Sequence, residues 1–241
     1  MFLSTNKLYR QPLNKLPIRK LLITTINAHS YNLAQTDVIY QKALINSDIL
    51  IPDGISVVWA IRWLTGEKII KIAGADVFFY EMERLNQIGG KCFFLGSSEA
   101  TLAKIKEKST MQYPNVIVQS YSPPFKPEFN LNENTAILEA INAFQPDVLM
   151  VGMTAPKQEK WAYLHYHSLK VGHICCIGAV FDFYGGIINR APQWMIKMGL
   201  EWLYRLIKEP KRMWRRYLIG NVLFISYIIK EKRGKRNSSS K

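Results

Sequence analysis

Four short apolar runs of the chain end in residues that could bind or activate a substrate. Thr25 and Asn27 close the first run with hydrogen-bonding side chains, and Asp53 follows the second with a carboxylate. Gly96 and Ser97 follow the third and open a turn into a helical pattern, where free backbone N–H groups suit a phosphate. This turn lacks the full G-x-G-x-x-G fingerprint, so alone it indicates phosphate contact only weakly.

The fourth run ends at Gly152 and leads into a segment that begins a helix. Pro156 suits the first helical position, and Gln158 and Glu159 fall in the first turn. There they can face a ligand or simply cap the helix. Asp53 has a similar alternative, because a carboxylate between a strand and a Gly-helix pattern is, taken alone, more typical of an N-cap.

The sequence predicts no bound metal or other cofactor. It contains no Asp-x-Asp pair, with which nucleotide-sugar enzymes usually hold Mg²⁺ or Mn²⁺, and no G-x-x-x-x-G-K-[ST] loop. The cysteines lack CxxC spacing and are expected to be reduced and to pack as small hydrophobes: Cys92, Cys175 and Cys176.

The elements that position these residues alternate between strand and helix patterns. Short apolar runs predict buried strands at 21–26, 48–51, 91–95, 116–120, 147–151 and 173–177. Apolar spacing of three and four predicts helices near 30–46, 55–65, 76–88, 98–112, 132–144 and 156–169. Such uniformly apolar strands indicate an α/β fold, a Rossmann-like, mostly parallel sheet with helices on both faces. Ligands of such sheets bind beyond the carboxyl ends of the strands, where the polar residues fall.

Positive charge is concentrated in the last part of the chain. Residues 190–241 carry fourteen Lys and Arg against three Glu, a net +11 of the formal +14. Residues 1–189 are close to neutral, with eighteen basic and fifteen acidic side chains. We therefore predict an α/β core over 1–189 and a basic appendage over 190–241.

The predicted appendage has the character of a membrane-surface segment. One amphipathic helix is expected over 192–208, a break at Glu209-Pro210, and a second helix over 211–229. Trp and Tyr interleaved with basic residues favour an anionic membrane surface over a nucleic acid. The longest apolar run is about 18 Å long as a helix, too short for the roughly 30 Å hydrocarbon core. Because the N-terminus also lacks a signal-peptide pattern, we expect a cytoplasmic protein, peripheral on the inner face of the cell membrane.

Taken in order, the polar strand ends and the tail resemble the WecG/TagA/CpsF glycosyltransferase family. The matching segments cover most of residues 21–218: TTINAHSYNLAQ, ILIPDGISVVWA, KIAGADVF, FFLGSS, PDVLMVGMTAPKQEKW, GAVFDFYGG, RAPQWM and GLEWLYRLIKEPKRMWRRY. PKQEKW followed by the two tail segments is the most specific part of the match. The sequence departs from the family in a shortened N-terminus, and in Met153-Thr154, where many members have a small residue and Gly.

The resemblance implies a metal-independent, inverting hexosyltransferase of cell-envelope polysaccharide synthesis, such as that of teichoic acid. The enzyme would move a sugar, often N-acetylmannosamine, from a UDP-sugar to a sugar linked to polyprenyl diphosphate, as in undecaprenyl diphosphate. Asp53 becomes the general base that takes the proton of the attacking hydroxyl. Thr25 and Asn27, at the end of the neighbouring strand, would hold donor or acceptor hydroxyls in line for the reaction.

Without a metal, the departing UDP needs cations from the protein. Arg205, Arg212 and Arg215 are the candidates, because guanidinium groups bind diphosphate bidentately, although they could instead bind only lipid head groups. The resemblance also implies a set of nucleotide-side residues: Gly96, Ser97, Gly152, Gln158 and Asp182.

Two other functions compete with this interpretation. A dinucleotide-binding, Rossmann-like oxidoreductase would need a glycine fingerprint followed by an acidic residue about twenty positions later. A nucleic-acid-binding module could use the basic tail, but the near-neutral core with polar strand ends argues against it. The sequence leaves open the donor sugar and whether the chain forms a homo-oligomer.

Overall fold

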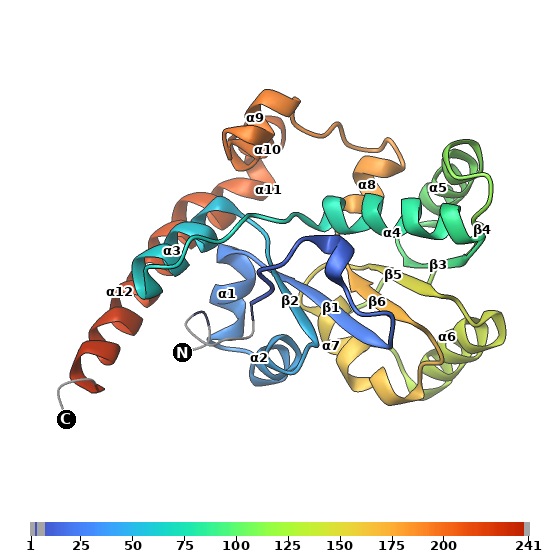
Figure 1. Cartoon of the computed structure of the whole chain (residues 1–241), viewed down its shortest axis with the longest axis horizontal. Helices are drawn as coiled ribbons and strands as arrows, with labels where there is room; N and C mark the ends of the chain where they lie inside the picture. The colour runs from blue at the N-terminus through green and yellow to red at the C-terminus, as the bar shows by residue number, and fades with distance from the viewer. Residues whose placement is uncertain (1–2, 4–7, 239–241) are drawn as a thin grey trace.

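A six-stranded, wholly parallel sheet forms the centre of the protein in the computed structural model (Figure 1). The structure describes residue 3 and residues 8–238, without the side chains of 235–238. The strands are β1 (Leu21–Ile26), β2 (Ile49–Pro52), β3 (Lys91–Gly96), β4 (Ile117–Tyr121), β5 (Val148–Gly152) and β6 (His173–Cys176). They lie in the order β2-β1-β6-β5-β3-β4, which confirms the predicted α/β class and all six predicted strands.

Helices cover both faces of the sheet because successive strand residues point to opposite sides. Phe94 and Met150 face one core, while their chain neighbours Phe93 and Leu149 face the other. Figure 1 shows α4, α5 and α8 on one side of the sheet and α2, α6 and α7 on the other. β4 departs from the prediction of a fully buried strand, because it is the edge strand and Ile117 is exposed.

Apart from α8, for which no helix was predicted, the helices of the α/β part largely follow the predicted segments, with one exception. They are α1 (Ala28–Ala34), α2 (Val38–Ile45), α3 (Ile55–Thr65), α4 (Gly74–Ile88), α5 (Glu99–Gln112), α6 (Leu131–Phe144), α7 (Lys157–Leu164) and α8 (Val180–Tyr184). Short 3-10 turns occur at η1 (Leu13–Lys15) and η2 (Tyr166–Ser168). The exception is the predicted helix 30–46, which is two helices, because the Asp37 side chain accepts a hydrogen bond from the Tyr40 N–H and starts α2 anew.

The basic segment forms a helical cluster followed by one long helix. Its elements are α9 (Gln193–Lys197), α10 (Glu201–Lys208), α11 (Pro210–Trp214), the π-helical turn η3 (Arg215–Ile219) and α12 (Gly220–Ser238). The break at Glu209-Pro210 is confirmed. The expected single helix over 192–208 is wrong, because Gly199 adopts a left-handed φ of 73° and separates α9 from α10. The second helix also extends beyond the predicted end at 229.

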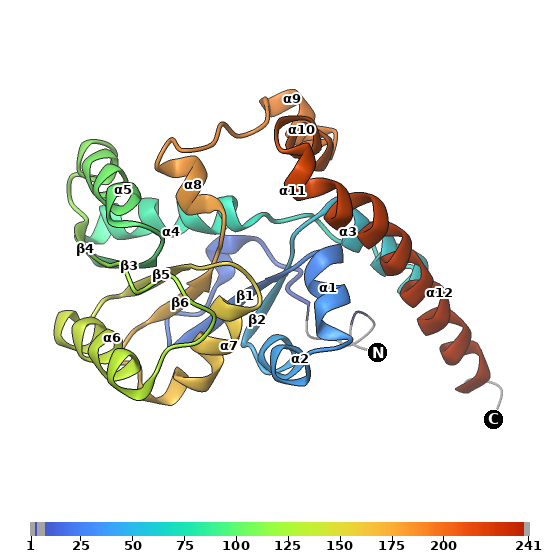
Figure 2. The same cartoon turned by 180° about the vertical axis from the view of Figure 1, so that it is seen from behind.

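The long helix α12 packs against the α/β part of the chain. Figure 2 shows it running beside α3 and α1. Phe224 meets the Tyr31 ring edge-to-face at 5.3 Å, and the Tyr31 hydroxyl donates to Glu231 at 2.8 Å. Asn32 donates to the Gly220 carbonyl at 2.7 Å. The α/β part and α12 therefore share one hydrophobic cluster. The division into a core over 1–189 and an appendage over 190–241 stays a prediction. Within the described residues, no helix has both the length and the apolar composition needed to cross a bilayer.

Candidate active site

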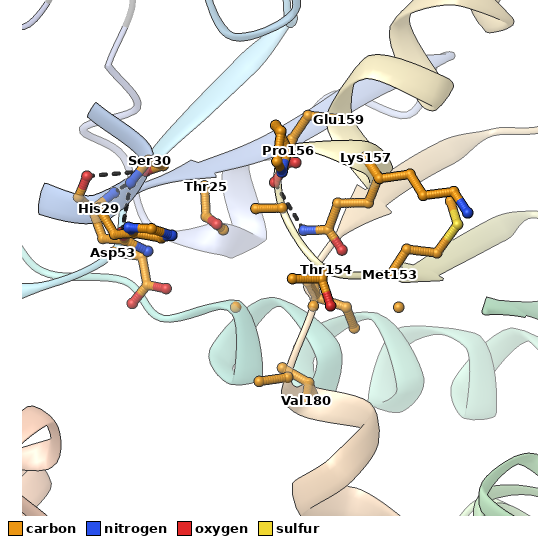
Figure 3. Close-up of a pocket in the computed structure, with 18 of the residues that line it drawn as sticks. Thr25, His29, Ser30, Asp53, Met153, Thr154, Pro156, Lys157, Glu159 and Val180 are labelled. Atoms are coloured by element: carbon orange, nitrogen blue, oxygen red, sulfur yellow. Dashed lines mark hydrogen bonds between the residues drawn. The ribbon is translucent and has the colours of Figure 1, made fainter. Parts of the chain in front are cut away.

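A cavity of about 2090 Å³ opens at the carboxyl ends of the strands. Its walls come from the strand ends, the proline-rich loop after β4, the first turn of α7 and the tail helices. Figure 3 shows Asp53 and His29 together on one side and Met153 and Thr154 on the other. The part of the cavity near Asp53 thus collects residues from both the α/β core and the basic segment.

Asp53 and Asn27 lie side by side because β1 and β2 pair in register. The last pair is Ile26 with Pro52, and the Asp53 backbone N–H donates to the Ile26 carbonyl at 2.8 Å. The N-cap of α3 is Gly54, at φ 120°, and no side chain caps this helix. The capping alternative for Asp53 is therefore wrong, and its carboxylate lines the cavity.

Asn27 lines the cavity but also holds the helix that follows it. Its Oδ1 accepts from the Ser30 backbone N–H at 3.0 Å, and its own N–H donates to the Ser30 hydroxyl at 2.7 Å. This cap does not use the amide Nδ2, which can therefore contact a substrate. Thr25, one residue before the end of β1, also lines the cavity.

The environment of Asp53 suits a proton acceptor. Burial, with a contribution from the Glu201 carboxylate, raises the pKa of Asp53 to about 6. Lys71 and Arg205 oppose this rise. A general base works best when its pKa lies near the working pH, so this carboxylate could be ionised yet still basic near neutrality.

Four residues around Asp53 were not predicted as site residues: Lys71, Arg190, Glu201 and His29. Glu201 lies 3.8 Å from the Lys71 Nζ and 3.6 Å from the Arg190 Nε, and all three line the cavity. The fourth, His29, has a pKa lowered to about 4 by burial and by Arg216. A signal was present, because Lys71 opens the KIAG segment, Arg190 opens RAPQWM and Glu201 lies within GLEWLYR.

The predicted glycines meet at the other end of the cavity. Gly96 and Gly152 are paired in register at the ends of β3 and β5. A Cβ on Gly96 would lie 2.6 Å from the Gly152 carbonyl oxygen, and one on Gly152 would lie 2.4 Å from the Phe181 ring. Gly96 (φ 116°) and Ser97 (φ 60°) both lie in the left-handed region. This bare backbone can approach a ligand closely, as phosphate-binding turns do.

The first turn of α7 adds a buried polar pair, Gln158 and Glu159. The Gln158 Nε2 donates to the Glu159 Oε1 at 2.8 Å, and the two residues are 3% and 1% exposed. The helix itself has Pro156 as its N-cap without a side-chain cap, so neither residue caps it. Burial raises the pKa of Glu159 to about 7. Within the part of the chain that the structure describes, the Gln158 Oε1 and the Glu159 Oε2 are buried without a hydrogen-bond partner, which suits hydrogen bonds to a bound ligand.

Besides Arg190, three arginines of the tail line the cavity, and they are not the three that were predicted. Arg205 and Arg212 line the cavity as predicted. Arg215 is exposed, lies over the Trp214 ring and is not among the lining residues, so its predicted placement is wrong. Arg216 lines the cavity in its place. The physical reason is the π-helical turn that starts at Arg215, because a π turn changes the register of side chains around a helix.

Two of these arginines have an unsatisfied hydrogen-bond donor. The Nε atoms of Arg205 and Arg216 are buried and have no hydrogen-bond partner among the described residues, and the Arg205 guanidinium stacks 4.7 Å from the Phe183 ring centroid. Arg212 is paired with Glu209 at 2.6 Å. Asp182 lines the same wall. Burial raises its pKa against the opposing effect of Arg212 and Arg205. Among the described residues, no group of three or more His, Cys, Asp or Glu could hold a metal ion.

The sheet order fixes how far apart these groups lie. Asp53 follows β2 and Gly96 ends β3, with β1, β6 and β5 between them. Four strand spacings separate the two, about 19 Å in total. The cavity can therefore hold an extended ligand, with the carboxylate at one end and the bare backbone at the other.

Comparison with known proteins gives matches over most of the chain. The family model described as "Glycosyl transferase WecG/TagA/CpsF family" matches residues 5–238. An N-acetylglucosaminyldiphosphoundecaprenol N-acetyl-beta-D-mannosaminyltransferase of Bacillus subtilis (strain 168) is 30% identical, over 89% of this chain and 81% of that protein. A protein of the same name from Bacillus spizizenii (strain ATCC 23059 / NRRL B-14472 / W23) is 27% identical, over 80% of this chain and 73% of that protein.

Proposed function

The chain belongs to the glycosyl transferase WecG/TagA/CpsF family, and on that premise we propose that it is an inverting glycosyltransferase with a UDP-sugar donor. Its acceptor is a sugar linked to polyprenyl diphosphate, in the synthesis of a cell-surface polysaccharide. The observation that carries the proposal is the half-buried Asp53, whose pKa is raised to about 6 in a cavity that also holds unpartnered arginine nitrogens. A base and a diphosphate cradle are the two groups that this transfer needs.

Asp53 is the general base of the proposed reaction. The acceptor hydroxyl oxygen attacks the anomeric carbon of the donor sugar while its proton passes to the Asp53 carboxylate. The bond from that carbon to the UDP oxygen breaks, and UDP leaves with the electron pair. Because attack and departure occur on opposite sides, the anomeric configuration inverts. Proton transfer of this kind contributes about 10²–10⁴-fold in rate.

Arginines stabilise the departing UDP in place of a metal ion. Arg205 and Arg216 present guanidinium groups with buried, unpartnered Nε atoms to the cavity, and Arg212 lines it beside them. Fixed cations placed where negative charge develops are worth several kcal/mol, on the order of 2.7–4 for a single donor. In this proposal the stabilisation of UDP by the arginines requires no metal ion.

The glycine end of the cavity holds the donor nucleotide. Gly96, Ser97 and Gly152 leave backbone accessible for close approach, and the buried oxygens of Gln158 and Glu159 accept hydrogen bonds from the donor. The relatives named above transfer N-acetyl-beta-D-mannosamine, and we propose the same or a related hexose here.

The protein works as a peripheral protein on the cytoplasmic face of the cell membrane. The basic segment of net +11 and its exposed apolar residues support this location: Trp194, Met198, Ile207 and Trp214. Each basic residue near an anionic leaflet contributes about 1 kcal/mol, so the segment suffices for peripheral binding.

The test is a transfer assay with the full chain. UDP-N-acetylmannosamine and UDP-N-acetylglucosamine are each incubated with a short-chain polyprenyl-diphosphate-N-acetylglucosamine, and UDP release is measured. We expect acceptor-dependent release with one donor and a product heavier by one N-acetylhexosamine. NMR of the product should show the anomeric configuration opposite to that of the donor. Binding of UDP without any acceptor-dependent release would refute glycosyl transfer to this acceptor class.

A further inference from the structure

The cavity does not end at Asp53 but continues between two helices. Ile55, Trp59 and Trp63 line it from α3 at intervals of four residues, one stripe of the helix. Asn221, Ile225 and Ile228 line it from α12 in a second stripe. Figures 1 and 2 both show α3 and α12 lying alongside one another. We call the space lined by these two stripes the α3–α12 channel.

The channel and the cavity differ in polarity. Near Asp53 the lining carries several charged groups: Lys71, Arg190, Glu201, Arg205 and Arg216. None of the six residues that define the channel is charged, and five of them are apolar. A ligand that fits both parts has an anionic head and an uncharged, apolar tail.

We propose that the α3–α12 channel binds the first isoprenoid units of the acceptor's polyprenyl chain, while the acceptor's diphosphate and sugar lie at the charged end of the channel beside Asp53. This inference rests on the proposed function and specifies how its acceptor is recognised. α3 begins two residues after Asp53, so the sugar at the head of the acceptor reaches the base while its isoprenoid chain lies farther along α3. From Ile55 to Trp63 the helix rises about 12 Å, so the channel can contact the isoprenoid chain over about that length.

The exposure of the channel fits a ligand that arrives from a bilayer. Trp59 is 66% exposed, Trp63 50% and Ile225 56%, so the channel is open along its side. Its floor is closed, because Phe224 and Ile228 are buried in the same hydrophobic cluster as Val57 and Ala60. An isoprenoid chain can therefore enter sideways from the membrane without unfolding the protein. Once bound, it covers the three exposed apolar side chains Trp59, Trp63 and Ile225.

The deciding experiment measures binding, not turnover. The full chain is titrated with inorganic diphosphate and with dimethylallyl, geranyl and farnesyl diphosphate, below the concentrations at which these lipids aggregate. Each buried methylene tightens binding by roughly fourfold, so even a half-open channel should favour geranyl over dimethylallyl diphosphate by roughly tenfold or more. We expect the Trp59→Ala/Trp63→Ala double variant to lose most of this preference while binding inorganic diphosphate as the wild type does.

A matched control separates the channel from general membrane contact. Trp194 and Trp214 are exposed tryptophans of the tail that do not line the cavity. Trp194→Ala/Trp214→Ala should keep the chain-length preference and weaken only the binding to vesicles of anionic phospholipid. Thermal unfolding of both double variants verifies that each is folded.

The results also separate this inference from the proposed function. Equal affinity of the wild type for all chain lengths overturns the channel, even if glycosyl transfer is observed. A chain-length preference that survives in Trp59→Ala/Trp63→Ala overturns it as well. If this double variant loses only its binding to vesicles, the face of α3 and α12 is a membrane contact and not a channel for the isoprenoid chain. A preference that is present and lost as expected, with no transfer to any acceptor, supports the channel and refutes the transferase.

Discussion

Replacing Asp53 by Asn should slow the enzyme and stabilise it at the same time. Asn has nearly the shape of the protonated carboxyl, but it cannot accept a proton. We therefore expect Asp53→Asn to lower kcat by about 10²–10⁴-fold, the usual contribution of a general base. Because the base must be ionised, the wild-type rate should itself fall as the pH drops below about 6.

The gain in stability follows from the raised pKa. Burial holds the pKa of Asp53 at about 6, against 3.8 for the free side chain, so the folded state keeps its proton over a pH range in which the unfolded chain loses it. The contribution of Asp53 to wild-type stability therefore falls as the pH rises from about 4 to 6 and then levels off. A shift of about 2 units corresponds to about 3 kcal/mol of unfolding free energy. Asp53→Asn lacks this fall, and should be about 3 kcal/mol more stable than wild type above pH 7 and equal to it below pH 4.

Urea denaturation at a series of pH values tests the prediction, and Asp37→Asn is the control of opposite sign. Although burial opposes the effect, the Tyr40 backbone N–H and Lys160 together lower the pKa of Asp37. Its ionised form therefore stabilises the fold above the unfolded pKa, and that stability is lost as the pH falls. Asp37→Asn should thus be less stable than wild type at neutral pH.

Two results would refute the reasoning on Asp53. An unfolding free energy of Asp53→Asn that runs parallel to the wild type across pH 4–7 would mean that this carboxyl is not held in a desolvated site. A loss in kcat below about tenfold would leave it without the role of base.

Other consequences of the site can be tested in the same way. EDTA should leave the transfer rate unchanged. Inhibition by EDTA that Mg²⁺ or Mn²⁺ reverses would mean that a metal ion, and not the arginines, stabilises the departing UDP. Arg205→Ala and Arg216→Ala should each lower kcat by roughly 10²-fold in steady-state assays. Lys208→Ala, at an exposed position of α10 outside the cavity wall, should change kcat little. Gly152→Ala places a Cβ 2.4 Å from the Phe181 ring, and should lower the unfolding free energy by about 1–3 kcal/mol in urea.

Predictions from local patterns succeeded where the structure is itself local. The six apolar runs became the six strands, and Glu209-Pro210 ended a helix where proline chemistry requires it. The predicted helix 30–46 failed because the Asp37 cap competes with an apolar spacing that continues through it. The prediction that Arg215 faces the cavity was wrong, because the π turn that brings Arg216 there instead cannot be recognised from the spacing of side chains in the sequence.

For the site, the sequence by itself could name candidates but could not group them. It determined that Asp53 and Asn27 follow neighbouring apolar runs, because a strand end is visible in a few consecutive residues. Only the tertiary structure decided that Asp53 does not cap α3, and that Glu201, far along the chain, helps burial to raise its pKa. The physical reason is that burial and charge act through space. The crossovers of a parallel sheet and the packing of α12 on α1 and α3 bring those groups together, and no periodicity along the chain records either.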